Sequence, residues 1–349
     1  MPIIEPTGRT RVLVTGGNGY IALWVVRTLL EQGYVIRAIV RSLEKGQHMQ
    51  ELFRSYGDKL QLFVVEDLSK DGAFDEAVKG VDAIEHIASP ATLLSVNPDD
   101  YIKPAVQGTV GLLESARKFG DKVKCIIITS SVGAIHESGP NHGTVTFDET
   151  NWNNGAIQTV KEKGGEAHPL ILYSTSKTLA EKAAWDFYKK YKGEVQWDLI
   201  VLGAPLQEPP KTPKDLNTSM AIFWDIIAND KSEEELKQSI NLVHAQDIAD
   251  AHVQALRKEK AGGERIIISG MAIAWQQIRN TVHSLKPELH TLGILPHRNP
   301  DLDAPIQFIF NGGKAQKILD LKYAPVEKVI SDALAYFEER GWLEKPVKA

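Results

Sequence analysis

The stretch Thr15-Gly16-Gly17-Asn18-Gly19-Tyr20-Ile21-Ala22 decides the fold. It follows a short β-branched run and opens an amphipathic segment. Gly16, Gly19 and Ala22 fit the spacing G-x-x-G-x-x-A. The first glycine permits a tight turn, and the second lets the backbone approach a pyrophosphate. The third small residue allows the helix to pack closely on the strand. A glycine pattern alone also fits a simple turn. The strand, turn and helix context is what predicts a dinucleotide site, with the helix N-terminus facing an anion.

The chain continues by alternating β-branched runs with amphipathic segments. We expect strands at 12–15, 35–40, 60–65, 83–87, 123–129, 197–202 and 265–269. We expect helices at 21–32, 43–56, 73–79, 101–119, 170–192, 274–284, 314–319 and 326–340. Continuously apolar strand runs are typical of sheets covered on both faces. The pattern therefore predicts an α/β fold, a Rossmann-type doubly wound parallel sheet with right-handed crossovers.

Two stretches interrupt this order. Residues 138–168 are rich in Gly, Asn and Pro and are expected to form a long loop, and 204–215 hold four prolines. We therefore predict a larger nucleotide-binding domain over 1–203, to which 243–270 return. Residues 204–242 and 271–349 are expected to form a smaller, mostly C-terminal substrate lobe.

Composition narrows the class of protein. The chain has 349 residues, of which 43% are hydrophobic, and a net charge of −5, so no basic excess points to nucleic acid. The lone Cys125 lies in an apolar run, which favours a reducing compartment. Without a leader-like start or a long apolar run, we expect a cytoplasmic protein that makes no membrane contact. The histidines show no ligand spacing, so no metal is expected.

The end of the second predicted strand bears on which dinucleotide is bound. Enzymes that use NAD place Asp or Glu there to hold the ribose hydroxyls. This chain has Arg41, with Arg37 before it and Lys45 after it. An arginine can grip a 2′-phosphate through two hydrogen bonds, whereas a carboxylate would repel it. The alternative is that these are solvated surface charges. The pattern favours NADP(H).

The end of the third predicted strand carries a carboxylate. Asp67 can accept a hydrogen bond from an adenine amino group, or it can cap the turn before Ser69. The sequence leaves both interpretations open.

Tyr173 and Lys177 stand four residues apart, so they share one face of a predicted helix. A phenol is a weak acid, and a neighbouring ammonium is expected to lower its pKa. Such a tyrosine can protonate a carbonyl oxygen, while the ammonium can hold a nicotinamide ribose. A second copy, Tyr188 and Lys192, lies in a run of lysines. We interpret that copy as structural, at a solvated helix end.

Thr129, Ser130 and Ser131 end the fifth predicted strand, where ligands of open α/β sheets bind. We assign Ser131 the catalytic hydrogen bond to a substrate carbonyl and Ser130 a supporting position. Strand-end capping is the alternative for at least one of these serines.

Together these motifs resemble the extended short-chain dehydrogenases. More closely they are similar to the dihydroflavonol reductase and cinnamoyl-CoA reductase group, and especially to its fungal aldehyde and ketone reductase branch. Further stretches carry the same resemblance, namely His86-Ile87-Ala88-Ser89-Pro90, Pro104-Ala105-Val106, Gly108-Thr109, Val243-His244 and Asp247-Ile248-Ala249-Asp250-Ala251-His252.

The resemblance implies a Ser131, Tyr173 and Lys177 triad. It also implies that Arg41 binds the 2′-phosphate, that Asp67 and Leu68 contact adenine, and that Ala88 and Ser89 lie along a cofactor ribose. The full set of predicted cofactor contacts is Gly16, Gly19, Tyr20, Ile21, Ala22, Arg41, Lys45, Asp67, Leu68, Ala88, Ser89, Thr129, Tyr173, Lys177 and Pro205.

Two positions depart from the pattern of that group. Ala22 replaces the third glycine of the turn and is followed by Leu23, and Gly203-Ala204-Pro205 stands where Pro-Pro is usual. These changes put the shape of the nicotinamide and substrate wall in doubt.

The favoured function is NADPH-dependent reduction of an aldehyde or ketone by a monomer or homodimer. The segments 91–96, 132–135, 168–172 and 206–224 are expected to line the substrate, and their apolar character favours an apolar or aromatic carbonyl compound. One alternative is a nucleotide-sugar epimerase or dehydratase, which would need basic residues in the smaller lobe. The other is a catalytically silent NADP(H)-binding regulator, which would not need the triad.

Overall fold

A parallel sheet forms the base of the molecule in the computed structural model, which describes residues 3–89, 95–137, 143–204, 218–296, 299 and 301–344. Its seven strands run in the order β3-β2-β1-β4-β5-β7-β9, and every neighbouring pair is parallel. The strands are β1 (Arg11–Thr15), β2 (Val35–Val40), β3 (Leu60–Val64), β4 (Ala83–His86), β5 (Cys125–Ser131), β7 (Asp198–Ala204) and β9 (Arg265–Ile267). This order confirms the predicted Rossmann-type sheet.

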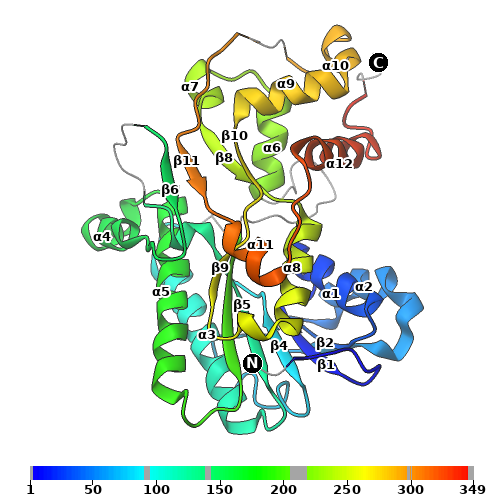
Figure 1. The fold of residues 1–349 in the computed structure, drawn as a ribbon, viewed down its shortest axis with the longest axis vertical. Helices are drawn as coiled ribbons and strands as arrows, with labels where there is room; N and C mark the ends of the chain where they lie inside the picture. Colours follow the sequence, from blue (N-terminus) through cyan, green and yellow to red (C-terminus); the bar gives the residue numbers. More distant parts are fainter. Residues whose placement is uncertain are drawn as a thin grey trace.

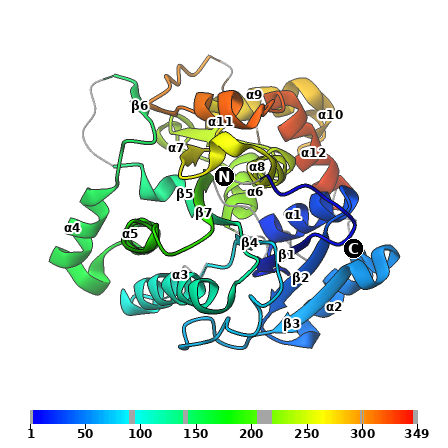
Figure 2. The ribbon, with the colours of Figure 1, turned by 60° about the horizontal axis from the view of Figure 1, so that its bottom comes forward.

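Helices cover both faces of this sheet (Figure 2). On one face, apolar residues of β1, β2 and β5 pack with α1 (Tyr20–Glu31), α8 (Ala245–Arg257) and α11 (Gly313–Leu319). On the other face, alternate residues of the same sheet pack with α3 (Asp99–Phe119) and α5 (Pro169–Tyr191). Helix α2 (Leu43–Leu52) follows β2, and α4 (Asn154–Lys163) packs on α5. Burial on both faces explains why the strand sequences lack polar alternation.

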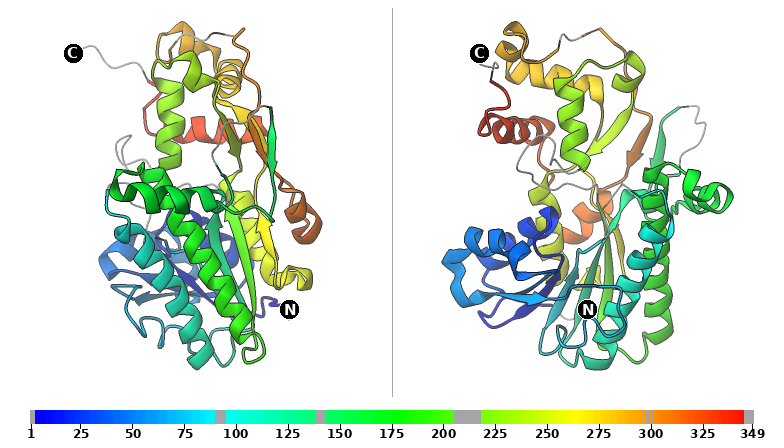
Figure 3. Two further views of the ribbon diagram at one scale, coloured as in Figure 1. Left: turned by 90° about the vertical axis from the view of Figure 1, so that its left-hand side faces the viewer. Right: turned by 180° about the vertical axis from the view of Figure 1, so that it is seen from behind.

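A smaller lobe stands over the sheet and has its own apolar core, which includes Phe223, Ile278, Ile330 and Phe337 (Figures 1 and 3). It contains α6 (Thr218–Ala228), α7 (Glu233–Leu236), α9 (Trp275–Leu285), α10 (Pro287–Thr291), α12 (Val326–Glu338) and the antiparallel pair β8 (Ser239–Leu242) and β10 (Met271–Ala274). Between these elements the chain returns to the larger body, where α8 packs on α1 and β9 joins the sheet. Helix α11 packs there as well. The residue boundaries of the two domains stay a prediction.

Two expectations about local structure are wrong. Residues 73–79 form consecutive turns instead of a helix. The glycines at both ends, Gly72 and Gly80, take positive φ angles of 72° and 66°. A segment this short is a marginal helix by itself, and here the burial of Phe74 and Val78 fixes its shape.

The described part of the expected loop at 138–168 contains regular structure. Strand β6 (Val145–Phe147) pairs in parallel with β11 (Phe308–Phe310), and α4 follows it. Asn153 caps α4 by accepting a hydrogen bond from the Ala156 N–H at 2.9 Å. The remaining short helices are the 3-10 turns η1 (Arg54–Lys59), η2 (Val132–Ala134), η3 (Gly164–Glu166) and η5 (Glu259–Ala261).

Candidate active site

The glycine turn after β1 has no room for a side chain at Gly16 or Gly17. Gly16 has a φ of 65°, and a Cβ on it would lie 2.9 Å from the Cα of Ala88. A Cβ on Gly17 would lie 2.8 Å from the Cβ of Ala38. Both glycines are therefore needed for the turn to lie against β2 and the residues after β4. Gly17 was missing from the predicted set, although the glycine pair was a visible signal for it.

The first turn of α1 suits a diphosphate. Gly19 is the N-cap residue, no side chain caps the helix, and the first turn contains no acidic residue. In such a turn the first backbone N–H groups of the helix, those of Tyr20, Ile21 and Ala22, have no hydrogen-bond partner within the helix. The helix end is thus positively polarised and free of competing carboxylates, so these residues fit the phosphates of a dinucleotide.

Arg37 lies within β2 and Arg41 follows the strand, and the two side chains differ in their contacts. Arg37 donates to the carbonyl oxygens of Ala77 and Lys79 at 2.7 and 2.9 Å, which commits it to the fold. Arg41 is exposed at the end of β2, and Lys45 is exposed in the first turn of α2. The sequence alone could not separate these arginines, but the contacts leave Arg41 as the one suited to a ligand phosphate.

Asp67 lies beside Arg41, at the end of β3. Its Oδ1 accepts hydrogen bonds from the Ser69 N–H at 2.9 Å and the Ser69 hydroxyl at 2.6 Å. These bonds are the main cause that lowers the Asp67 pKa, and the Arg41 charge adds a smaller lowering. The Oδ1 atom of Asp67 therefore caps the turn before Ser69, as one of the two interpretations expected. The contact of Asp67 with adenine stays a prediction.

Leu68 follows β3, and Ala88 and Ser89 follow β4. The Leu68 carbonyl faces Gly108 of α3, where a Cβ would approach it to 3.6 Å. The Ala88 N–H donates to the Thr15 hydroxyl at 3.0 Å, and Ser89 is half-buried. Pro205, like residues 91–94 and 206–217 of the predicted substrate wall, lies outside the described residues.

The side chains of the last three residues of β5 form hydrogen bonds with three different groups. The Thr129 hydroxyl lies 3.2 Å from His252 Nε2 of α8. The Ser130 hydroxyl donates to Glu181 of α5 at 2.6 Å. Successive side chains leave a strand on opposite faces, which explains this division. The Ser131 oxygen instead accepts from the Gly133 N–H at 3.0 Å, so its proton remains available to another acceptor.

Tyr173 lies one turn inside the start of α5. His168 caps that helix, accepting from the Leu170 N–H at 3.3 Å. The Tyr173 side chain is 6% exposed, and its hydroxyl has no hydrogen bond that meets ordinary geometry. Burial raises its pKa, while the nearby Ser131 side chain lowers it by a smaller amount. The expected lowering of the Tyr173 pKa is therefore wrong, because burial has the largest effect and raises it.

The Lys177 ammonium is held beneath the end of β5. It is 6% exposed and donates to the Thr129 carbonyl at 3.1 Å. Burial lowers its pKa from 10.5 to about 8, and the charge of Glu181 acts in the opposite direction. Nearby His86 is also buried, and burial together with the Lys177 charge lowers its pKa to about 3. Lys177 is thus the cation of this site at neutral pH, and His86 is neutral.

The second tyrosine and lysine pair lies at the other end of α5. Tyr188 is 3% exposed, stacks on Trp197 and donates to Asp198 at 2.5 Å. Lys192 lies over the Tyr188 ring at 5.3 Å. The expected solvated position is therefore wrong for Tyr188, although its contacts are those of a structural residue.

Among the described residues, no group of three His, Cys, Asp or Glu side chains could hold a metal ion. Within the described ranges, no helix combines the length and the apolar character that a membrane span requires. Cys125 is buried as a free thiol.

Comparison with known proteins identifies the family. A sequence profile of the NAD dependent epimerase/dehydratase family matches residues 12–269, so the chain belongs to that family. A ketoreductase of Aspergillus niger is 31% identical over 348 residues, covering 95% of this chain and 98% of its own. A cinnamoyl-CoA reductase of Medicago truncatula is 32% identical over 334 residues, covering 94% and 96%.

The fold comparison agrees with the sequence comparison. The crystal structure of the yeast methylglyoxal/isovaleraldehyde reductase Gre2 complexed with NADPH superposes with a TM-score of 0.83 at 28% identity. The match covers 95% of this chain and 100% of the Gre2 chain. The predicted resemblance to the reductase group of the extended short-chain dehydrogenases is confirmed.

Proposed function

We propose that this chain reduces an aldehyde or ketone to an alcohol with NADPH. It is an NADP(H)-dependent oxidoreductase of its family, as its reductase relatives and an NADPH-bound structural neighbour support. The observation that carries the reaction type is the Tyr173 hydroxyl, which is buried next to Ser131 and has no other hydrogen-bond partner among the described residues. A buried phenol with a raised pKa keeps its proton until an acceptor arrives.

When bound, the reduced nicotinamide supplies a hydride to the carbonyl carbon. Tyr173 then donates its proton to the carbonyl oxygen, as a general acid. The Ser131 hydroxyl donates a hydrogen bond to the same oxygen as negative charge develops there. The Lys177 ammonium favours that charge from below and binds the nicotinamide ribose. Thr129 holds Lys177 in place through its carbonyl oxygen.

At the other end of the cofactor, the glycine turn and α1 bind the diphosphate, and Arg41 binds the 2′-phosphate. Lys45 adds a second positive charge at the start of α2, while Asp67 and Leu68 contact the adenine. Ala88 and Ser89 lie along the ribose, and Pro205 lies beside the nicotinamide. The substrate is an apolar or aromatic carbonyl compound. The protein acts as a monomer or homodimer in the cytoplasm, without nucleic acid or membrane partners.

The test is a panel of alkyl and aromatic aldehydes and ketones, with NADPH and NADH compared by loss of absorbance. We expect turnover with NADPH and a much lower kcat/KM with NADH. NADPH that binds but is never oxidised would favour the silent regulator. Equal efficiency with NADH would remove the role given to Arg41.

A further inference from the structure

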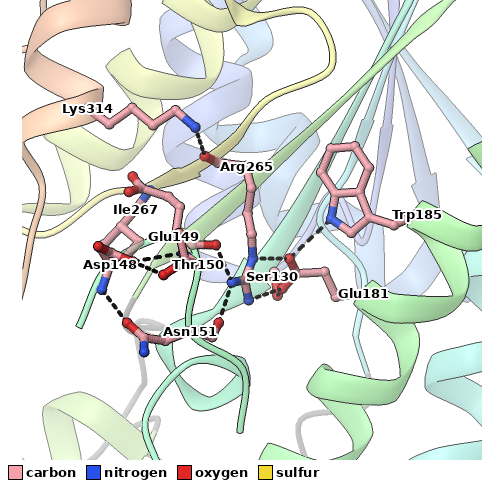
Figure 4. A network of polar contacts seen from close by, with 10 residues as sticks. All are labelled: Ser130, Asp148, Glu149, Thr150, Asn151, Glu181, Trp185, Arg265, Ile267 and Lys314. Atoms are coloured by element: carbon pink, nitrogen blue, oxygen red, sulfur yellow. Dashed lines mark hydrogen bonds and ion pairs between the residues drawn. The ribbon is translucent and has the colours of Figure 1, made fainter. Parts of the chain in front are cut away.

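A buried polar network lies behind the carboxyl end of β5 (Figure 4). Its centre is Glu181, which follows Lys177 by one turn of α5 and is 3% exposed. The carboxylate accepts from the Ser130 hydroxyl at 2.6 Å and from the Trp185 indole N–H at 3.3 Å. Neither of these donors has a role in the proposed chemistry.

The partner of Glu181 is Arg265, the first residue of β9. Its Nε and Nη2 donate to the two carboxylate oxygens at 2.5 and 3.4 Å. Its Nη1 donates to the carbonyl oxygens of Glu149 and Asn151 at 2.8 and 2.5 Å, and the guanidinium lies 3.8 Å from the centre of the Trp152 ring. Arg265 therefore ties α5 and β9 to the segment 149–152 (Figure 4).

Asn153, the residue that follows this segment, contacts the turn after Ser131. The Asn153 side chain donates to the Gly133 carbonyl at 2.9 Å, and its N–H donates to the Ala134 carbonyl at 2.9 Å. The Gly133 N–H in turn donates to the Ser131 oxygen. The network thus holds Ser130 directly and holds the turn that orients Ser131 through Arg265 and Asn153.

An ion pair in this position contributes little net stability. Removing a carboxylate and a guanidinium from water is costly, and an apolar pair of similar volume is often as stable. The pair is consequently best explained by where it places its charge and its hydrogen bonds. The charges of Glu181 on the same helix and of Lys177 interact, the neutral His86 on β4 lies near Lys177, and Tyr173 shares the helix face of Lys177.

We propose that Glu181, paired with Arg265, is a positioning residue of this active site. It fixes Ser130 beneath Ser131 and places a negative charge one helical turn from the Lys177 ammonium, which keeps that ammonium protonated at neutral pH. The inference rests on the proposed function, since Lys177 and Ser131 must act as described there. It adds a residue on which their alignment and charge depend.

The charge effect has a definite sign. The folded state lowers the pKa of Lys177 through burial, and Glu181 opposes that lowering. In Glu181→Gln the opposing charge is lost while the Arg265 charge stays, so the Lys177 pKa falls further. Turnover that needs the ammonium should then be lost at lower pH. A shift of about one unit corresponds to a tenfold change in the ratio of protonated to neutral lysine.

The experiment measures kcat against pH and, separately, NADPH affinity by fluorescence across the same range. In Glu181→Gln we expect the upper limb of both profiles to move to lower pH, and kcat to fall at pH 8 with little change in carbonyl KM. Glu181→Asp keeps the charge, so it should keep the position of the limb. Glu149→Gln makes the same chemical change where a carboxylate accepts from the Ile267 N–H, and it should not move the limb.

The outcomes separate the two proposals. If Glu181→Gln and Glu181→Asp move the limb equally, or neither moves it, the positioning role is wrong. Melting temperatures of all variants show whether folding is intact, and Glu181→Asp serves as the second variant if Glu181→Gln fails to fold. If the wild type binds NADPH but reduces no carbonyl compound, the proposed function fails. The fluorescence profiles then still decide whether Glu181 governs the Lys177 charge.

Discussion

A Tyr-x-x-x-Lys motif begins twice on helix α5, at Tyr173 and at Tyr188, and the two copies differ in their surroundings. Tyr173 has a buried hydroxyl with no conventional hydrogen bond, whereas Tyr188 donates its proton to Asp198. Lys177 is buried under the end of β5, whereas Lys192 follows the end of the helix and lies over an aromatic ring. The copies are fifteen residues apart, roughly 22 Å along a helix. A reactive tyrosine is therefore defined by its environment, and the motif only makes it possible.

The largest effect should come from the first copy. Tyr173→Phe removes the proton donor and keeps the ring that packs against Leu172 and Tyr101. A general acid contributes roughly 10²–10⁴ to rate, so kcat should fall by that order. NADPH affinity, measured by fluorescence titration, should stay close to that of the wild type. A variant with half of the original kcat would remove Tyr173 from the reaction.

Ser131→Ala should have the next largest effect. An oxyanion hydrogen-bond donor is worth roughly a hundredfold or more in kcat, and this hydroxyl is the one free to donate at the strand end. Ser130→Ala is the matched control, since its hydroxyl is committed to Glu181. We expect Ser130→Ala to lower kcat much less. Steady-state kinetics with saturating NADPH compares them, and a reversed order would exchange the roles of the two serines.

The pH profile should report Lys177. Its pKa in the folded protein is about 8, below the ordinary 10.5, so the ammonium is present below that pH and is lost above it. Activity should consequently decline as the pH rises through about 8. Lys177→Arg keeps a permanent charge. Its kcat should be lower at pH 7, but its upper limb should move to higher pH, and an unmoved limb would assign that titration to another group.

A smaller effect is expected at the nucleotide end. Arg41→Ala removes a charge-assisted contact worth roughly 1.5–3 kcal/mol, or about ten- to a hundredfold in the KM for NADPH. The KM for NADH should change little. Arg37→Ala is not an equivalent change, because Arg37 supports two carbonyl groups of the fold. Kinetics with both cofactors would count against the 2′-phosphate contact if both KM values rose together.

The sheet could be predicted because its strands are short apolar runs between clear breaks. Residues 35–40 were placed without error, and the other strands of the sheet differ only at their ends. The pattern fails where distant contacts decide the structure. Strand β6 has three residues and exists because β11, more than 150 residues later, pairs with it. The turns at 73–79 keep a helix-like pattern, but flanking glycines and burial prevent a helix.

In the candidate site, too, local sequence patterns predict some residues, whereas distant contacts decide others. Spacing placed Tyr173 and Lys177 on one helix face, and the end of a strand placed Ser131. Glu181 was also within reach of that reasoning, since it continues the Tyr173 and Lys177 face by one more turn. Arg265 gave no local signal, because only the sheet order brings β9 beside β7 and its first residue toward α5. The raised pKa of Tyr173 likewise follows from burial, which spacing does not report.

The most direct test of the comparison is to measure kcat for Tyr173→Phe and Tyr188→Phe side by side, with NADPH and one carbonyl substrate that the wild type reduces. The two variants make the same chemical change on the same helix. Tyr188→Phe should keep kcat within about twofold of the wild type and lose about 1.5–3 kcal/mol of unfolding free energy with its hydrogen bond to the Asp198 carboxylate. Tyr173→Phe should be nearly inactive. Comparable kcat values for the two variants, or an inactive Tyr188→Phe that still folds and binds NADPH, would contradict the account.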